Sequence, residues 1–461
     1  MKKYFLPAVL AFTAAAFVAC NKDDDDIPDN PEVNIDGPAI DNKAPLSPED
    51  QKEYLEAVAE AFMDLTPASD FTELADLINY CSEHFDEDRY DWDDVEEWAE
   101  DAWDALVVKT GSHEEDDYWT HYIYTDYKAL VAASNFTGHF EDKGGYWKRT
   151  NASDLQFTFK DDHGALIEAT LTTSGSTKEL NIGEIDVYDH GVCDYVHYTD
   201  YYNNYKTTVI VPETIDLTLK KGSTTLVHTV INIDLSSLSG KDFVNSSSLS
   251  VTQTTDFYNG YKLQLTQAKY SAGKSAACTF ALSNKSGNLF TAAIGADIKG
   301  LPQFNSGTWS DDEYDDDDLD LMDGSITQIA VDVLGKVQVK GSLSDVHKFI
   351  DYIEEADDCS SSDRNGIQAA LNKANRLLDL SIYYDGKSLR QAKVTLEAVL
   401  DEEWDGRKYY DIMPVLNFED GSSYDSFEAF FNDKDFASAI RAFKRLANQY
   451  ADLIDEAERP Y

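Results

Sequence analysis

The first folded part of the chain shows the apolar spacing of α-helices. Ser47 precedes Pro48 and two acidic residues, which is the usual composition of a helix N-terminus. Apolar residues then recur every three or four positions. The same spacing begins again near Ser69 or Asp70 and near Asp91. We therefore predict an N-terminal helical segment over residues 47–110.

Between about Trp119 and Val339 the apolar spacing changes to two, as in β-strands. Short turns that contain glycine separate the apolar runs, and Asn259-Gly260 is the strongest hairpin signal. This order predicts an antiparallel meander over residues 111–342 instead of strand–helix–strand units. The expected strands are 155–159, 165–171, 214–220, 224–235, 244–257, 261–269, 278–282, 289–298 and 326–339.

Helical spacing returns in the last quarter of the chain. It covers residues 343–355 and 366–380, and two further strands are expected within 394–418. Closing helices are expected at 427–431 and 436–457. Residues 343–461 therefore form a C-terminal α/β segment that closes the body. The predicted class is α+β, with a large curved antiparallel β-sheet flanked by N- and C-terminal helices.

Composition narrows the possible partners. A chain of 461 residues with 42% hydrophobic residues can bury a large core. Its formal net charge of −49 repels polyanions, so we exclude nucleic acid as a ligand. We interpret the acidity mainly as a source of solubility.

The N-terminus has the pattern of an export signal. Lys2 and Lys3 precede an apolar run of about 15 residues, whereas a membrane-spanning helix needs about 20. The residues Phe17-Val18-Ala19-Cys20 resemble the lipobox of bacterial lipoproteins. This resemblance implies a signal peptide over residues 1–19, which is removed, and lipidation of Cys20. The acyl chains would then hold the protein in a membrane.

A second resemblance follows directly. Asn21-Lys22-Asp23-Asp24-Asp25-Asp26 resembles the acidic export signal of Bacteroidetes lipoproteins. It implies a lipid-anchored protein on the outer face of the cell outer membrane. Residues 20–46 are rich in proline and acids, which predicts a flexible tether with a typical reach of about 30 Å. The stretch 418–431 is similar to the ends of uncharacterised Bacteroidetes lipoproteins, which implies no activity.

Known catalytic motifs are incomplete in this sequence. Gly273-Lys274-Ser275 lacks the first glycine of a phosphate-binding loop, because position 268 is alanine. His113-Glu114-Glu115 lacks the second histidine of a zinc protease, and no G-x-S-x-G occurs. The sequence therefore favours a protein without enzymatic activity. Four cysteines besides Cys20 leave zero, one or two disulfides open.

Two segments have metal-binding composition. His190, Cys193 and His197 have a spacing that zinc accepts, although we favour an ordinary polar loop as the explanation. The acidic segment 311–323 offers oxygen ligands for Ca²⁺, but it departs from the EF-hand order, so we favour a solvated insertion over a dedicated calcium site. The candidate calcium ligands are Asp311, Asp312, Asp316, Asp318 and Asp320.

Clustered tyrosines suggest a ligand site. Aromatic rings flanked by carboxylates suit glycans, although alternating tyrosines also pack in ordinary sheets. The candidate ligand-binding residues are Tyr195, Tyr198, Tyr201, Tyr202 and Tyr205. We therefore predict a surface-displayed lipoprotein that binds an extracellular glycan or protein. The alternatives are a periplasm-facing carrier of lipid or another hydrophobic ligand, and a hydrolase with an unrecognised carboxylate site. The oligomeric state stays open.

Overall fold

The structure is a computed structural model. It describes residues 27–33, 38–40, 43–85, 90–116, 120–132, 136–189, 198–238, 248–271, 274–297, 324–419, 421–422 and 430. Its described strands belong to one 17-stranded sheet. Within these ranges no helix has the length and apolar character needed to cross a membrane.

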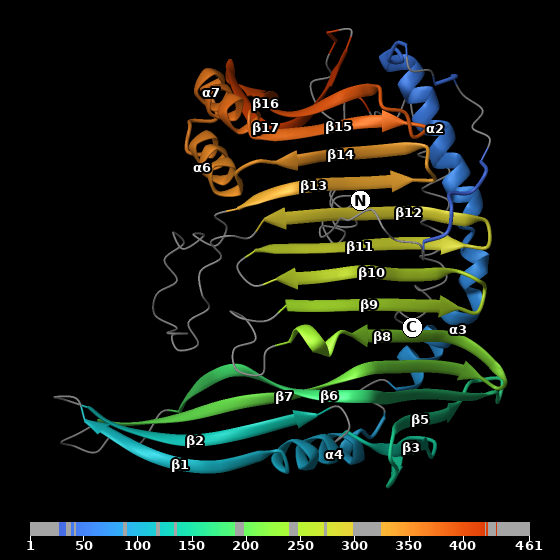
Figure 1. The fold of residues 1–461 in the computed structure, drawn as a ribbon, viewed down its shortest axis with the longest axis vertical. Coiled ribbons are helices and arrows are strands. Elements are labelled where there is room, and N and C mark those ends of the chain that lie inside the picture. Colours follow the sequence, from blue (N-terminus) through green and yellow to red (C-terminus); the bar gives the residue numbers. More distant parts are fainter. Residues whose placement is uncertain are drawn as a thin grey trace.

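A long meander forms most of the sheet (Figure 1). From β5 to β17, each strand pairs antiparallel with the next one in the chain. The strands are β5 (Leu155–Lys160), β6 (Leu166–Asp189), β7 (Tyr198–Lys221), β8 (Thr224–Ile233), β9 (Ser248–Phe257), β10 (Lys262–Ser271), β11 (Ser275–Asn284), β12 (Gly287–Asp297), β13 (Ser325–Val333), β14 (Val337–Leu343), β15 (Leu378–Tyr384), β16 (Arg390–Trp404) and β17 (Arg407–Phe418).

Four earlier strands make the sheet mixed. They are β1 (Val107–Asp116), β2 (Thr120–Ala132), β3 (Gly138–Asp142) and β4 (Trp147–Thr150). β2 pairs with β7 in parallel, and so does β3 with β5. The α+β class and a mostly antiparallel sheet are therefore confirmed, but a purely antiparallel meander is wrong at these two pairs.

The length of β7 explains the parallel pairing with β2. β7 has 24 residues, and β8 pairs only with residues 214–221. The remaining backbone on that edge, residues 198–210, is free to pair with β2. Period-two spacing indicates a strand but carries no information about a distant partner, so the sequence did not predict this pairing.

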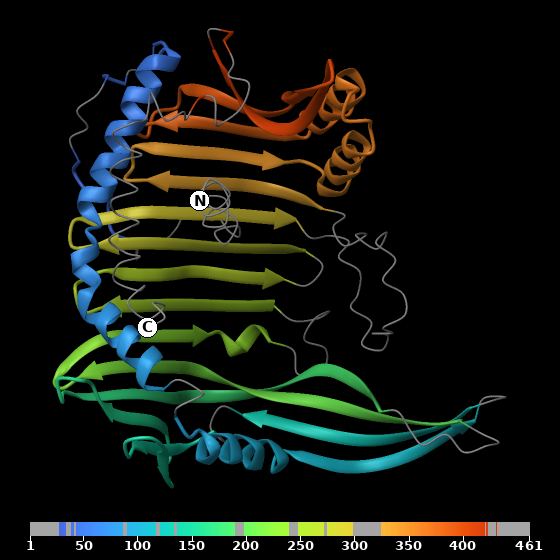
Figure 2. The same cartoon turned by 180° about the vertical axis from the view of Figure 1, so that it is seen from behind.

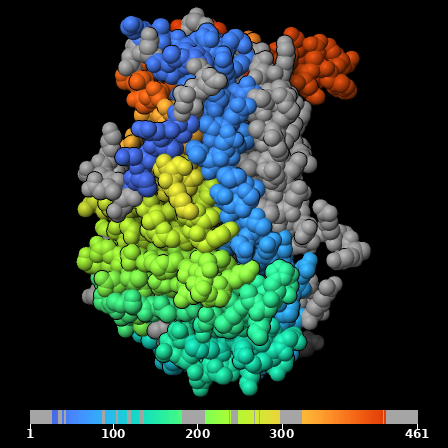
Figure 3. Space-filling view, turned by 90° about the vertical axis from the view of Figure 1, so that its right-hand side faces the viewer, coloured from blue at the N-terminus to red at the C-terminus, as the bar shows by residue number. Residues whose placement is uncertain are grey.

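α2 and the α6–α7 pair lie at opposite ends of the strands (Figures 1 and 2). α2 (Pro48–Leu65) crosses the strand ends at one edge of the ladder, which we call the α2 edge. Figure 3 views the molecule from that side, with α2 in blue. The opposite edge, the far edge, carries α6 (Val346–Asp357) and α7 (Arg364–Ala374). The other helical elements are η1 (Ala68–Phe71), α3 (Thr72–His84), α4 (Asp93–Asp104) and η3 (Leu235–Ser237).

Several local predictions are confirmed. Ser47 caps α2, because its side chain accepts a hydrogen bond from the backbone N–H of Asp50. The hairpin at Asn259-Gly260 joins β9 to β10. The predicted strand 326–339 is wrong, because a turn at Leu334-Gly335 divides it into β13 and β14. Both turn residues have positive φ, yet the Leu334 side chain is buried in the core, so its apolar character hid the turn.

The described part of residues 27–46 packs against the body. The backbone N–H of Asn288 donates to the Asp29 carbonyl oxygen at 2.9 Å. The Leu46 N–H donates to Oε1 of Gln391 at 2.8 Å. Val33, Ile40 and Leu46 also pack against the main core. The prediction of a free tether as far as residue 46 therefore needs correction, because the residues described within 27–46 lie against the body at the α2 edge.

Three groups of buried side chains form the core. The main cluster joins α2 to β12 and β14–β17, with Tyr54, Leu289 and Tyr384 among its members. An aromatic cluster joins α3 to β3–β8 and centres on Phe140 and Trp147. A third, smaller cluster holds α6 and α7 against β16 and β17.

Candidate functional sites

The predicted tyrosine site is only partly within the described residues. Tyr198, Tyr201, Tyr202 and Tyr205 lie on β7, and Tyr195 lies outside the described residues. Successive positions of a strand alternate between the two faces of a sheet. Positions 198 and 202 therefore belong to one face, and positions 201 and 205 belong to the other. The backbone of β7 does not bring the four residues to a single platform.

The other predicted site residues lie outside the described ranges. These are Cys20, the His190–Cys193–His197 group and the acidic segment 311–323. Within the described ranges, no group of three or more His, Cys, Asp or Glu residues is arranged to hold a metal ion. Cys81, Cys278 and Cys359 are free thiols, and Cys193 is outside the description.

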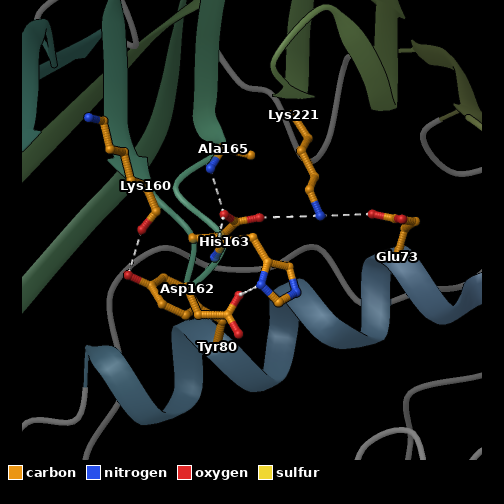
Figure 4. Close-up of polar contacts among 8 residues, drawn as sticks. Glu73, Tyr80, Lys160, Asp162, His163, Ala165 and Lys221 are labelled. Atoms are coloured by element: carbon orange, nitrogen blue, oxygen red, sulfur yellow. Dashed lines mark hydrogen bonds and ion pairs between the residues drawn. The ribbon is translucent and has the colours of Figure 1, made fainter.

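A polar clasp ties α3 to two hairpin turns of the α2 edge (Figure 4). Nζ of Lys221 lies 2.8 Å from Oε2 of Glu73 and 3.2 Å from Oδ2 of Asp161. Oδ1 of Asp161 accepts the backbone N–H groups of His163 and Ala165 at 3.1 and 2.7 Å. We call Glu73, Asp161 and Lys221 the clasp. It joins the helix, the β5–β6 turn and the β7–β8 turn in one network.

The electrostatics of the clasp favour its charged form. Burial alone would raise the pKa of Asp161, but the hydrogen bond from Ala165 and the Lys221 ammonium lower it below its usual value. The hydrogen bond to Glu73 raises the pKa of Lys221 despite the burial of its side chain. The single Lys221 ammonium therefore lies between two carboxylates, and Lys221 does not provide a neutral amine for chemistry at neutral pH.

A second polar group lies inside the aromatic cluster. Oδ1 of Asp142 accepts the Tyr90 hydroxyl at 2.9 Å and the Gly144 N–H at 2.7 Å. Nε2 of His84 lies 3.4 Å from Oδ2 of Asp142, and the His84 ring stacks on Tyr80 at 4.9 Å between centroids. Burial opposes ionisation of Asp142, but these donors outweigh it and lower its pKa. Burial and the bond to Asp142 raise the pKa of Tyr90.

An aspartate–histidine pair also occurs in nucleophilic enzymes, where it activates a serine or cysteine. The cysteine on the same turn of α3 is Cys81, and burial raises the pKa of its thiol to about 11. It is therefore protonated at neutral pH and is a poor nucleophile. Burial, followed by the Asp142 charge, raises the pKa of Tyr80 to about 12, and its hydroxyl donates to the Lys160 carbonyl. This geometry supports a packing role for the pair.

The far end of the β16–β17 hairpin carries the most exposed large apolar side chain of the described residues. We call residues 400–409 the tip. Trp404 is 70% exposed, the largest value among the exposed large apolar side chains of the described residues. It precedes Asp405 and Gly406, whose positive φ values form a tight turn. Trp404 lies opposite Arg407, and Glu402 lies opposite Tyr409.

Helix α7 supports the base of this hairpin and stops short of its tip. The Asn375 side chain both donates to the carbonyl of Leu396 and accepts its N–H, each at 2.8 Å. The Gln368 side chain accepts the Ala398 N–H at 3.0 Å. These bonds replace a neighbouring strand, because β15 pairs with β16 only as far as Val394. Residues 400–408, beyond them, are all exposed.

Sequence reasoning missed both the clasp and the tip, for different reasons. The clasp joins residues 73, 161 and 221, which no local pattern connects. The tip had a usable signal, because an Asp-Gly turn after an exposed-face tryptophan marks a hairpin end. No protein-family model, no curated protein and no solved structure matches this chain.

Proposed function

We propose that this protein is a Bacteroidetes-type lipoprotein, anchored through Cys20 in the outer membrane and displayed on the cell surface, where it binds an extracellular glycan or protein. The observation that carries the proposal is the opposite placement of two segments. The chain enters the body at the α2 edge, where Asp29 and Asn30 meet the β11–β12 and β13–β14 turns. The exposed tip stands at the far edge.

Chain length supports this orientation. The stretch from Cys20 to Asp29 extends at most about 30 Å, even when fully stretched. A lipid on Cys20 therefore keeps the α2 edge near the membrane. β16 has 15 residues and spans about 50 Å. It begins at the turn of the α2 edge and ends at the tip, so the tip points away from the anchor.

We propose that the C-terminal segment closes the body. The closing helix expected at 436–457 lies outside the described residues. Phe430, which is described, is fully buried, and its ring lies 5.3 Å from Phe418 in the main core. The chain therefore enters the core just before this segment. Removal of residues 433–461 should lower the melting temperature by several degrees. An unchanged melting temperature would contradict a closing role.

Surface display is testable with one insertion and one substitution. A short epitope after Gly406 should be bound by antibody on intact cells, because a Cβ added at this glycine would meet no described atom within 4 Å beyond its two chain neighbours. Cys20→Ser should remove the protein from the membrane fraction, since the acyl chains are the anchor. Antibody binding only after the outer membrane is broken would place the protein in the periplasm and overturn surface display.

A further inference from the structure

We propose that the outer face of the tip is a binding site for a neutral saccharide, formed by Glu402, Trp404, Arg407 and Tyr409. The inference rests on the proposed function and names the class of ligand. Residues directly opposite each other in an antiparallel pair share a face and lie about 5 Å apart, and the next pair on that face follows after about 7 Å. The pairs Trp404–Arg407 and Glu402–Tyr409 satisfy this relation. The four side chains therefore project from one small area on the same face of the hairpin.

The chemistry of these four residues suits a sugar ring. The indole face of Trp404 is an apolar surface on which the C–H face of a pyranose can lie. The carboxylate of Glu402 accepts hydrogen bonds and the guanidinium of Arg407 donates them in a fixed fork, so both can pair with ring hydroxyls. Within the described part of the chain, neither of these two side chains makes a hydrogen bond or ion pair. Their bonding capacity is available to a ligand.

The opposite face of the tip packs against α6 and α7 and is not part of the proposed site. Leu400 and Tyr410 form the pair on that face. The guanidinium of Arg364, from α7, lies 5.6 Å from the Tyr410 ring. The backbone N–H of Tyr410 donates to the Ser361 carbonyl at 2.7 Å. The α6–α7 pair thus occupies the inner side, so the site is open on the outer side.

The small apolar area favours a saccharide over a protein partner. A stable protein interface buries about 800 Å² on each partner around an apolar centre. A single aromatic side chain offers about 150–250 Å². Of the exposed large apolar side chains in the described residues, only Trp404 and Leu400 belong to the tip, and they lie on opposite faces. One exposed ring with polar neighbours matches one or two sugar rings.

Net charge decides which saccharides are suitable. The chain carries a formal charge of −49, and the tip itself contains Asp401, Glu402, Glu403 and Asp405 beside Arg407 and Lys408. Glycans with uronic acid or sulfate groups are repelled by this field, most strongly at low salt. Neutral pyranose chains are not. We therefore expect binding of neutral oligosaccharides and none of anionic ones.

Calorimetric titration of the purified full chain tests the site. The probes are neutral hexasaccharides, namely β-1,4-glucan, α-1,4-glucan, β-1,4-xylan and α-1,6-mannan, with polygalacturonate as the anionic control. At least one neutral probe should bind, and Trp404→Ala should weaken it by about tenfold or more, because the stacking face is lost. Trp404→Phe should retain most of the affinity. Leu400→Ala, on the opposite face, should bind like the unaltered chain.

Two outcomes would overturn the proposal. One is the absence of binding to every neutral probe by the unaltered chain. The other is equal binding by Trp404→Ala, which would place any saccharide site elsewhere. Circular dichroism and melting curves of each variant exclude a folding defect as the cause. Antibody labelling of intact cells remains a separate result, so surface display can stand even if the saccharide site fails.

Discussion

The two edges of the sheet differ in whether their polar side chains are buried and hydrogen-bonded or exposed to solvent. At the α2 edge, polar side chains are buried and matched. Gln51 and Gln391 are 1% and 0% exposed, and Gln51 donates to both the Leu46 and the Gln391 carbonyls at 3.1 Å. At the far edge, the tip leaves Glu402 and Arg407 exposed. Buried polar groups must be satisfied for the fold to be stable, whereas exposed ones carry no such constraint. The contrast indicates that the α2 edge stabilises the protein and the tip is available for binding.

The largest expected effect concerns the aromatic cluster beside the α2 edge. Phe140→Ala should lower the free energy of unfolding by about 3–5 kcal/mol, because a fully buried ring is replaced by a cavity. Its ring stacks on Phe157 at 4.8 Å between centroids. Leu400→Ala, in the exposed tip, should cost less than about 1 kcal/mol. Urea unfolding measures both, and equal costs would contradict the difference between the two regions.

The next prediction compares Gln391 and Gln368, whose side chains each accept a hydrogen bond from a backbone N–H. Gln391→Ala should cost about 2–3 kcal/mol, because it removes a fully buried side chain together with the acceptor of the Leu46 N–H. Gln368→Ala removes the acceptor of the Ala398 N–H on the far edge. Gln368 is only half-buried, so water can replace it, and we expect a cost below about 1 kcal/mol. If the order of the two costs were reversed, the α2 edge would not be the stabilising one.

A smaller, pH-dependent effect belongs to the clasp. Asp161→Asn should cost about 1–2 kcal/mol at pH 7, because it keeps an acceptor for Ala165 but removes the charge facing Lys221. The folded-state pKa of Asp161 is lowered, so its contribution is present above its usual value of 3.8 and is lost as the pH falls below it.

The cost of Asp161→Asn should therefore shrink between pH 7 and pH 3, as measured by urea unfolding at each pH. Asp162→Asn is the matched control, since its side chain is 65% exposed. We expect the control to change stability by less than about 0.5 kcal/mol at any pH. A cost that stays constant with pH for Asp161→Asn would show that its charge does not stabilise the clasp.

The smallest effect on stability is expected at the tip. Trp404→Ala should change the melting temperature by less than about 2 °C, because the side chain is 70% exposed and has little surface to lose from the core. Differential scanning calorimetry measures this directly. A drop as large as that of Phe140→Ala would mean that Trp404 packs in the core and is not available to a ligand.

Local sequence signals predicted the elements better than their arrangement. The Ser47 cap and the Asn259-Gly260 hairpin depend on neighbouring residues, and both are confirmed. Leu334-Gly335 was missed, because leucine is unusual in a turn and its burial in the core compensates for the backbone conformation. The pairing of β2 with β7 depends on strand length and distant contacts, which a local pattern does not contain.

The candidate sites were harder to predict from the sequence than the helices and strands, because each depends on how distant segments are arranged. Tyrosine density along the sequence suggested a platform, but strand alternation assigns positions 201 and 202 to opposite faces. The clasp requires one helix and two turns to meet in space, so no spacing rule could predict it. Trp404 was visible as a residue beside an Asp-Gly turn. Its exposure depends on the tertiary structure, because the hydrogen bonds from α7 reach β16 only as far as Ala398.

The central claim is that the tip lies far from the membrane anchor and the α2 edge lies near it. The two ends of β16 allow a matched test, because Asp385-Gly386 and Asp405-Gly406 are turns with the same positive φ pattern. A fluorescent peptide tag is inserted into one turn or the other of the lipidated protein, which is then placed in vesicles that contain an acceptor lipid. We predict strong energy transfer from the tag at Gly386 and weak transfer from the tag at Gly406. Equal transfer, or the reverse order, would contradict the account.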